Sequence, residues 1–214
     1  MSESLETAIR HLILVLALAL SSVHPSCAQA QSSTLPTKPQ TSLAQHPDWP
    51  QANPSDVDTI EDTVRAFFSA ISAPSGGKLN RDRLHSLFVP DGRIAVCLPA
   101  PPGRVADVLF MTLDGYADRS DAATLKSGFF DRNLANHIER FGVMAHVYST
   151  YESRSQSGDK IPMARGIKSF ELLNSANRWY IVQIIWDSER PDNLIPERYL
   201  HDGSDSINGK QKDR

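Results

Sequence analysis

The stretch from Arg165 to Trp186 constrains the fold more than any other part of this chain. Two apolar runs, Ile167–Leu172 and Trp179–Trp186, flank the polar segment 174–177. Both runs are rich in β-branched and aromatic residues. The pattern therefore predicts a β-hairpin with a loop of about five residues.

Hydrophobic residues of the second run stand at both odd and even positions. Alternation along a strand places Trp179, Ile181 and Ile185 on one face, and Ile184 and Trp186 on the other. A strand that is apolar on both faces is expected to be buried on both. The pattern thus predicts a central strand in a sheet covered on each side, with the two tryptophans pointing in opposite directions.

The first 30 residues have the pattern of a secretory signal peptide. The apolar run Leu12–Leu20 is followed by small and polar residues that end in Ala28-Gln29-Ala30. The run is shorter than the roughly 20 apolar residues of a membrane span. We expect cleavage near Ala30, a periplasmic or secreted protein, and no stable membrane span. Two glutamates make the start of the chain less basic than usual, which a start codon placed upstream of the true one would explain; lipid attachment at Cys27 is the alternative.

Charge and cysteine content exclude several classes of protein. The formal net charge is −3, and removal of residues 1–30 brings it to about −2. No basic stripe is present, so nucleic-acid binding is not expected. After cleavage one cysteine, Cys97, is left in an apolar run, so the fold must be held by its core without an internal disulfide.

Composition divides the rest of the chain into three parts. Residues 31–55 are rich in Pro, Ser, Thr and Gln, with the single aromatic Trp49, and are expected to form a disordered linker. Residues 56–200 have the size of one ordinary domain. Residues 201–214 are polar and are expected to form a flexible tail.

The domain opens with helical patterns and continues with strand patterns. Apolar residues recur at helical spacing from Val57 to Ile71, with Asp58 and Glu61 spaced as a capping box. A second short helix is expected over 81–87 and a surface helix over 113–126. Strands are expected over 93–98, 105–112, 136–141 and 145–152, followed by the hairpin. This order predicts an α+β fold with the helices on one side of a curved sheet.

The same order, ending in the strand pair RGIKSFEL and RWYIVQIIW, resembles the nuclear transport factor 2-like superfamily. In that fold, also described as a SnoaL-like or cystatin-like cone, a strongly curved antiparallel sheet wraps around a long N-terminal helix. The resemblance covers about residues 57–186. The segments HIERFGVMAHVYSTYESR (137–154), RGIKSF (165–170) and WDSERPDN (186–193) look like an uncharacterised group of exported bacterial proteins.

The resemblance implies a site inside the cone but leaves the activity open. Members include isomerases, dehydratases, cyclases and epoxide hydrolases as well as proteins without catalysis, so the fold does not decide the function. Enzymes of this type use a carboxylate or histidine as general base and a polar partner to polarise a carbonyl. The candidates for the base are His146 and Asp131. The candidate ligand-binding residues are Tyr116, His137, Tyr148 and Arg165.

Each candidate also has a structural interpretation. His137 and Glu139 share one face of a strand and either line the cavity as a pair or lie on a solvated face. The face of His146 depends on the register through Gly142. Arg165 either binds an acidic ligand group or pairs with a neighbouring carboxylate.

We therefore expect an exported domain that binds a small apolar molecule in the cone. The alternatives are an isomerase, cyclase or dehydratase, and a homodimerising interaction module without catalysis. No HExxH, CxxC, phosphate-binding loop or dinucleotide fingerprint occurs, so neither a metal nor a nucleotide cofactor is expected.

Overall fold

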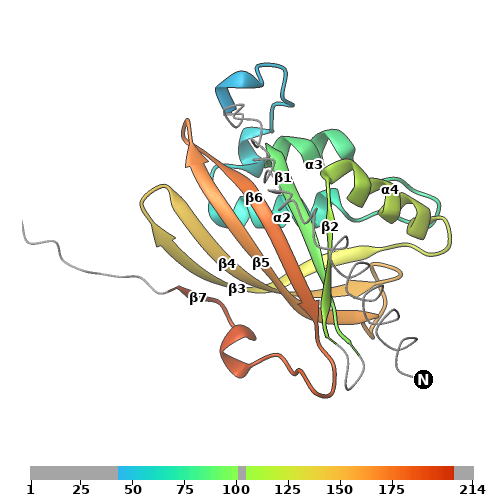
Figure 1. The fold of residues 1–214 in the computed structure, drawn as a ribbon. Helices are drawn as coiled ribbons and strands as arrows, with labels where there is room; N and C mark the ends of the chain where they lie inside the picture. The colour runs from blue at the N-terminus through green and yellow to red at the C-terminus, as the bar shows by residue number, and fades with distance from the viewer. Residues whose placement is uncertain (1–42, 101–104, 205–214) are drawn as a thin grey trace, which may run out of the picture. The chain divides into compact units, whose positions relative to one another are not determined.

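One strongly curved sheet lies against helices on its concave side (Figure 1). The computed structural model describes residues 43–100 and 105–204. Neighbouring strands follow the order β2-β1-β6-β5-β4-β3-β7. All pairs are antiparallel except β1–β6 and β3–β7, which are parallel. The predicted α+β cone is confirmed, with a sheet that is open rather than closed and not purely antiparallel.

The elements have the following bounds. The strands are β1 (Phe88–Leu98), β2 (Asp107–Met111), β3 (Phe130–Phe141), β4 (Met144–Arg154), β5 (Ala164–Ser175), β6 (Arg178–Ser188) and β7 (Gly203–Ser204). The α-helices are α2 (Ile60–Ala70), α3 (Arg81–Leu87) and α4 (Leu113–Thr124), and short 3-10 helices are η1 (Leu43–Gln45), η2 (Pro54–Asp56) and η3 (Glu197–Tyr199).

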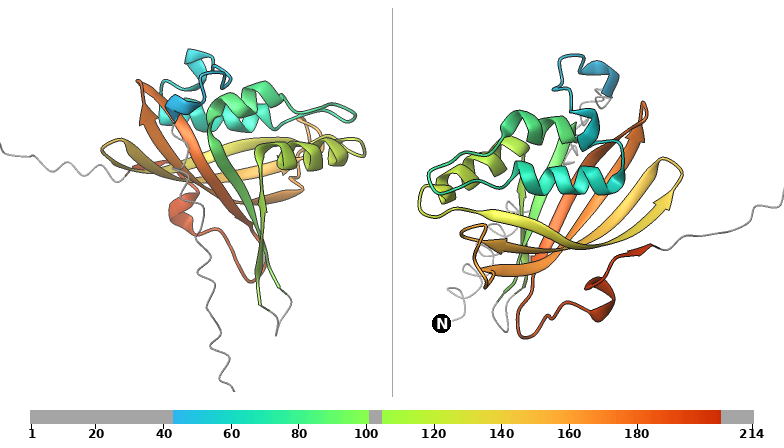
Figure 2. Two further views of the ribbon diagram at one scale, coloured as in Figure 1. Left: turned by 45° about the horizontal axis from the view of Figure 1, so that its top comes forward. Right: turned by 180° about the vertical axis from the view of Figure 1, so that it is seen from behind.

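Helix α2 lies inside the curve of the sheet and carries the centre of the core (Figure 2). Phe67 is 1% exposed, and its ring meets those of Phe88 and Phe170 edge-on at centroid distances of 6.1 and 5.3 Å. These contacts join the helix to β1 and β5. Apolar residues at helical spacing therefore face the sheet, as predicted.

The start of α2 differs by one residue from the prediction. Thr59, rather than Asp58, caps the helix: its hydroxyl accepts a hydrogen bond from the backbone N–H of Asp62 at 3.0 Å and donates one to the Asp62 carboxylate at 2.7 Å. Both positions have an acidic residue three places further on, so the capping-box spacing alone does not distinguish them.

The predicted β5–β6 hairpin is confirmed, with a tighter turn than expected. The strands extend to Ser175 and Arg178, leaving a two-residue turn. Both turn residues, Ala176 and Asn177, have positive φ, at 51° and 60°. Two successive left-handed residues match the right-handed twist of the strands, which is why two-residue hairpins adopt this geometry.

A β-bulge in β6 overturns the prediction that this strand is buried on both faces. Leu172 pairs with Ile181 and Glu171 with Gln183, so Val182 is an extra residue. The bulge changes which positions face inward: Trp179 and Ile181 point inward before it, and Ile184 and Trp186 after it. Both tryptophans therefore face the concave side, whereas Val182 and Ile185 are 38% and 37% exposed. The apparent two-sided hydrophobicity is a single inner face interrupted by a bulge.

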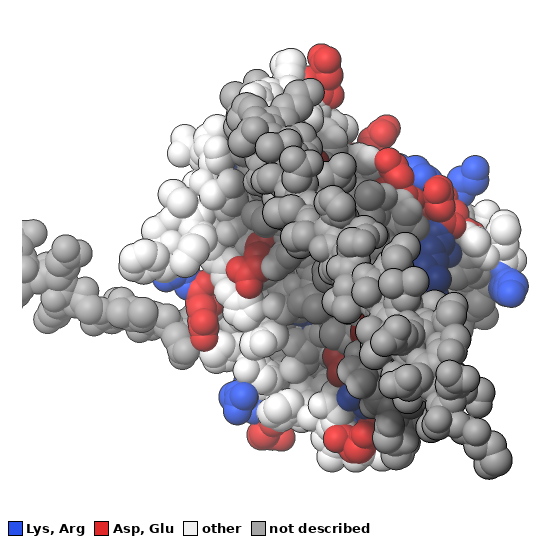
Figure 3. Space-filling view, viewed as in Figure 1, with Lys and Arg blue, Asp and Glu red and all other residues white. Residues whose placement is uncertain are grey.

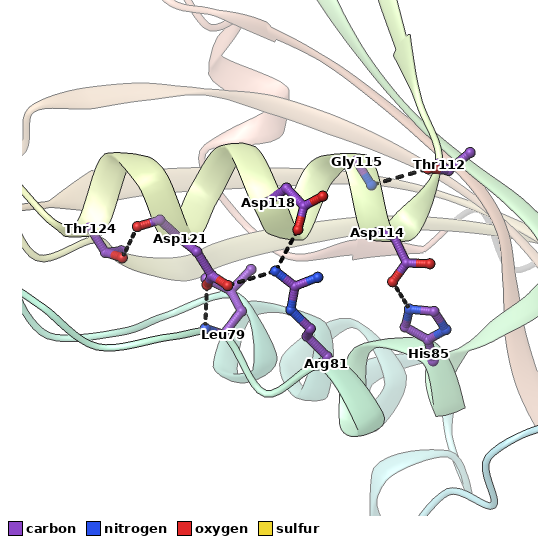
Figure 4. Close-up of polar contacts among 9 residues, drawn as sticks. All are labelled: Leu79, Arg81, His85, Thr112, Asp114, Gly115, Asp118, Asp121 and Thr124. Carbon is purple, nitrogen blue, oxygen red and sulfur yellow. Dashed lines mark hydrogen bonds and ion pairs between the residues drawn. The ribbon is translucent and has the colours of Figure 1, made fainter.

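Helices α3 and α4 are joined by charged side chains (Figure 4). Arg81 lies between Asp118 and Asp121, at 2.8 and 2.7 Å, and His85 Nε2 lies 3.0 Å from Asp114 Oδ1. Burial acts to raise the pKa of Asp121, but hydrogen bonds from Arg81 and from the Leu79 backbone N–H outweigh it and lower that pKa. This network holds α4 over the end of the sheet.

Both ends of the described chain pack on the domain. Trp49 lies in the segment expected to be a linker, yet its indole N–H is shared between the carbonyl oxygens of His85 and Phe88, at 3.1 and 2.9 Å. At the other end, residues expected to belong to the tail form β7 beside β3. The remaining parts of these predicted segments, including the signal peptide, lie outside the described residues.

Candidate functional site

A groove of about 730 Å³ lies between helix α2 and the edge strand β3. Arg65 and Phe68 line it from the helix, and residues 131–134, 136 and 138 line it from the strand. The lining combines apolar side chains with amides and charges of both signs. Such a mixture suits a ligand with an apolar body and polar groups.

A second bulge shapes the floor of this groove. Leu134 is an extra residue on β3 relative to β4 and is 39% exposed. Around it, Asn133 and Asn136 turn toward the concave side, where Asn133 Nδ2 donates to Asn136 Oδ1 and to Ser149 Oγ, both at 2.8 Å. Bulges commonly redirect side chains next to functional sites. Here the bulge brings two amides to the floor of the groove.

The free edge of β3 is protected on either side of the bulge. Ser72 Oγ accepts a hydrogen bond from the Asp131 backbone N–H at 3.0 Å. Beyond the bulge, Asp202 Oδ1 accepts one from the Asn136 backbone N–H at 2.8 Å, and β7 pairs with the next two residues. An edge strand otherwise exposes unpaired backbone groups. The edge therefore opens to the groove chiefly at residues 132–135.

The centre of the cone, where an apolar cavity was expected, is filled by a buried ion pair. Lys168 Nζ lies 3.2 Å from Asp131 Oδ2, and their side chains are 5% and 0% exposed. Ser153 donates to the other oxygen of Asp131 at 2.7 Å. The ammonium lies 3.6 Å from the ring centroid of Tyr151 and 4.7 Å from that of Trp186. We call Lys168, Asp131, Tyr151 and Trp186 the lysine cage.

Burial dominates the electrostatics of the cage. It lowers the pKa of the Lys168 ammonium, against the opposing attraction of Asp131. Burial also raises the pKa of Tyr151 to about 12, and it raises the pKa of Tyr116 on α4 further still. The Tyr116 ring meets Trp186 edge-on at 6.2 Å. Both tyrosines therefore stay protonated at neutral pH and can act as hydrogen-bond donors.

A glycine makes room for the cage. Gly166 lies opposite Tyr151 in the β4–β5 pair. A Cβ at this position would lie 2.2 Å from the carbonyl oxygen of Asp187 and 2.9 Å from the Tyr151 ring. Any larger residue would displace the tyrosine or the neighbouring strand.

Two of the six predicted site residues lie inside the cone. Asp131 and Tyr116 are 5% and 7% exposed, and the negative charge of Asp131 contributes to the raised pKa of Tyr116. The structure thus brings together the predicted base and one of its predicted partners. Asp131, however, is already engaged by Lys168, which the sequence did not single out.

The other four lie on the outer face of the sheet and do not line the cone. For His137, His146 and Arg165 this is the structural interpretation that the sequence left open. Val147 is in the core, and its neighbours His146 and Tyr148 point the opposite way. His146 Nε2 lies 2.9 Å from Ser169 Oγ, while His137 meets the ring of Tyr199 at 5.7 Å. Glu139 is paired across the strands with His146. The pair His137–Glu139 thus belongs to the outside of the sheet.

Arg165 follows the structural interpretation. It alternates with the inward Gly166 and Lys168, and its guanidinium lies 3.4 Å from the carboxylate of Glu189. Asp187 and Arg190 similarly pair at 2.9 Å where β6 ends. These contacts anchor the start of the C-terminal segment.

The C-terminal segment, residues 189–204, crosses the outer face (Figure 1). Thr150 donates to the carbonyl of Tyr199 at 2.5 Å, and the Tyr199 ring lies 5.2 Å from that of Tyr148. Between this segment and the sheet is a smaller pocket of about 330 Å³, which includes Cys97. The burial of Cys97 raises the pKa of its thiol.

The residues that sequence analysis missed are Lys168, Tyr151, Asn133 and Asn136. One signal was available for the first: a lysine inside a strand whose alternate residues, Phe170 and Leu172, are apolar is a buried-charge candidate. No comparable signal existed for the amides, because their direction depends on the bulge.

In residues 43–100 and 105–204 no three His, Cys, Asp or Glu side chains come together as metal ligands. No helix within these ranges is both long and apolar enough to cross a bilayer. On the part of the face that Figure 3 shows in colour, acidic and basic side chains are interspersed.

Comparisons with known proteins concern the fold alone. No family model and no curated protein matches the chain. Among solved structures, a protein of the NTF2-like family from Streptomyces avermitilis, provisionally described as a dehydratase, is 15% identical over 63% of this chain and 96% of its own, with a TM-score of 0.44. An NTF-2 like protein of unknown function from Silicibacter pomeroyi is 15% identical over 61% and 92%, with a TM-score of 0.41.

A third solved structure, from Shewanella frigidimarina, is provisionally described as a ketosteroid isomerase. It is 18% identical over 59% of this chain and 92% of its own, with a TM-score of 0.39. The assignment of the fold rests on the molecule itself: a strongly curved, mainly antiparallel sheet wraps around an N-terminal helix. The chain thus has the nuclear transport factor 2-like fold.

Proposed function

We propose that the domain binds a small amphiphilic molecule in the groove between α2 and β3. The observation that carries this proposal is the combination of volume and lining: about 730 Å³, with Phe68 and Ile138 beside Asn133 and Asn136. This volume lies in the range of small-molecule sites. It differs from the sequence-based expectation in place and in polarity, because the lysine cage fills the centre of the cone.

Amide NMR with a set of small amphiphilic fragments tests this proposal. Binding in the groove shifts the amide resonances of residues 61–69 and 131–138 and leaves those of β2 unchanged. Leu134→Trp fills the groove and abolishes the shifts. Leu125→Trp is the matched control, because Leu125 is 73% exposed and lies at the end of α4, away from the groove. Shifts that persist in Leu134→Trp contradict the proposal.

Export is the second part of the proposed function and rests on the N-terminal sequence pattern. N-terminal sequencing of the protein recovered from a bacterial periplasm or medium should begin near Gln31. Recovery of the full-length chain in the cytoplasm contradicts export.

The homodimer expected from the sequence stays a proposal. The C-terminal segment covers the outer face around His137 and Tyr148, and Val182 and Ile185 stay partly exposed beside it. Light scattering across a concentration series distinguishes monomer from dimer. If the dimer uses the exposed part of this face, Ile185→Glu weakens it. If Ile185→Glu leaves the dimer unchanged, the dimer uses another surface.

A further inference from the structure

We propose that Lys168 is a reactive amine that captures a ligand carbonyl, an aldehyde or ketone, as an imine. This inference rests on the proposed groove, because it names the chemical class of the molecule that the groove receives. The observations behind it are the surroundings of the ammonium and its place directly behind the groove wall.

The cage leaves hydrogen-bond donors of the Lys168 ammonium without acceptors, which a purely structural ion pair would provide. An ammonium has three donors. Within the described residues, the only carboxylate in ion-pair distance of Lys168 is that of Asp131, and aromatic rings occupy other sides. Well-built buried ion pairs satisfy the remaining donors with further hydrogen bonds. Here burial lowers the pKa of the amine, which raises the fraction of the neutral, nucleophilic form.

The groove leads to this amine. Asp131 and Phe68 line the inner end of the groove, and the same two side chains contact Lys168, at 3.2 Å to the carboxylate and 5.9 Å to the ring centroid. Phe68 is 3% exposed and stands between the groove and Nζ, so a carbonyl at this end reaches the amine only when the Phe68 ring moves aside.

The chemistry balances with the groups present. Lys168 gives one proton to Asp131, and the nitrogen lone pair attacks the carbonyl carbon. The C–N bond forms, the carbonyl π electrons move to oxygen, and the oxygen takes the proton from Asp131. The resulting carbinolamine still carries two N–H protons and loses one of them together with its hydroxyl as water. Ammonium and carbonyl thus give a protonated imine and water without any oxidant or reductant, and the positive charge stays beside Asp131. Tyr151 in the cage and Tyr116 beside it stay protonated and take no part in this proton transfer.

Reductive trapping in the intact protein tests the inference. The protein is treated with hexanal and cyanoborohydride at pH 7, and alkylated lysines are identified by peptide mass spectrometry. We expect Lys168 to be alkylated several times faster than the exposed Lys160, because burial lowers the pKa of the Lys168 amine and raises its neutral fraction, and because the groove holds the aldehyde beside it. Alkylation of Lys160 and Lys126 with none at Lys168 overturns the inference.

Two variants make the outcome specific. Phe68→Leu should speed alkylation of Lys168 and leave Lys160 unchanged, and circular dichroism confirms that the variant is folded. Leu134→Trp should slow alkylation at Lys168 alone. Equal alkylation of Lys168 in Leu134→Trp and wild type overturns the route through the groove. If Lys168 stays unlabelled while fragments still shift the groove amides, the covalent inference fails and the proposed binding function stands.

Discussion

The two faces of the sheet use polar residues in opposite ways. On the inner face one lysine and one aspartate are buried beside aromatic rings at the centre of the cone. On the outer face histidines, tyrosines and ion pairs are partly solvated and partly covered by the C-terminal segment. The difference shows that the face on which a strand position lies, more than its residue type, decides whether a polar side chain of this domain can belong to a site in the cone.

The largest effect should come from breaking the inner ion pair. Asp131→Ala leaves the Lys168 ammonium buried without its carboxylate, and we expect a loss of about 3–5 kcal/mol in the free energy of unfolding. The double variant Asp131→Leu/Lys168→Met should recover most of this loss, because it removes both charges. Urea denaturation measures each value.

The matched control for this experiment is the outer ion pair. Arg165 and Glu189 are 36% and 23% exposed, so Arg165→Met should cost at most about 1 kcal/mol. Equal losses for Asp131→Ala and Arg165→Met would contradict the distinction between the two faces.

The second effect tests the bulge in β6. Ile184 is 1% exposed and Ile185 is 37% exposed, although they are neighbours. Ile184→Ala should lower the free energy of unfolding by about 3 kcal/mol, whereas Ile185→Ala should cost less than about 1 kcal/mol. Thermal or urea unfolding of the two variants makes the comparison. The reverse order would place the bulge elsewhere.

A smaller effect should appear in the pH dependence. The folded-state pKa of Lys168 is lowered from 10.5, so the unfolded chain binds more protons below pH 10.5. Stability therefore rises with pH from the lowered folded-state value up to about 10.5. We expect this rise as the pH approaches 10.5 from below in wild type, and its absence in Asp131→Leu/Lys168→Met. A parallel pH dependence of the two proteins would contradict a buried Lys168.

The smallest effect concerns the C-terminal segment on the outer face. A Cβ on Gly203 would lie 2.5 Å from the ring of His137, so Gly203→Ala should detach β7 from β3. We expect the free energy of unfolding to fall by about 1 kcal/mol or less, and hydrogen exchange at the Asn136 amide to become faster. Exchange in α2 should stay unchanged. Unchanged exchange at Asn136 would show that Asp202 holds the edge without β7.

The sequence predicts the fold well and the site only in part, for a physical reason. Periodicity locates the elements, and α3 was predicted with the bounds observed, Arg81–Leu87. It cannot reveal an extra residue in a strand. Val182 and Leu134 are such residues, and each reverses the faces of the positions that follow. This explains why Trp186 was assigned to the wrong face.

The misplaced histidines have a related cause. His146 could be placed only after the register through Gly142 was known, and alternation alone allowed either face. Asp131 and Tyr116 were named because a carboxylate and a phenol can serve as base and hydrogen-bond donor, and no sequence pattern placed either side chain inside the cone. Lys168 was overlooked because a lysine in a strand is usually assigned to solvent.

The state of the Lys168 side chain is the most direct test of the central claim, that a lysine fills the cone and the ligand space lies beside it. Carbon-13 NMR of labelled lysines would report each ε-methylene through a pH titration. The account predicts one resonance, lost in Lys168→Met, that is shifted by the Tyr151 and Trp186 rings and titrates below 10.5. A Lys168 resonance that coincides with those of exposed lysines and titrates near ~10.4 would contradict it.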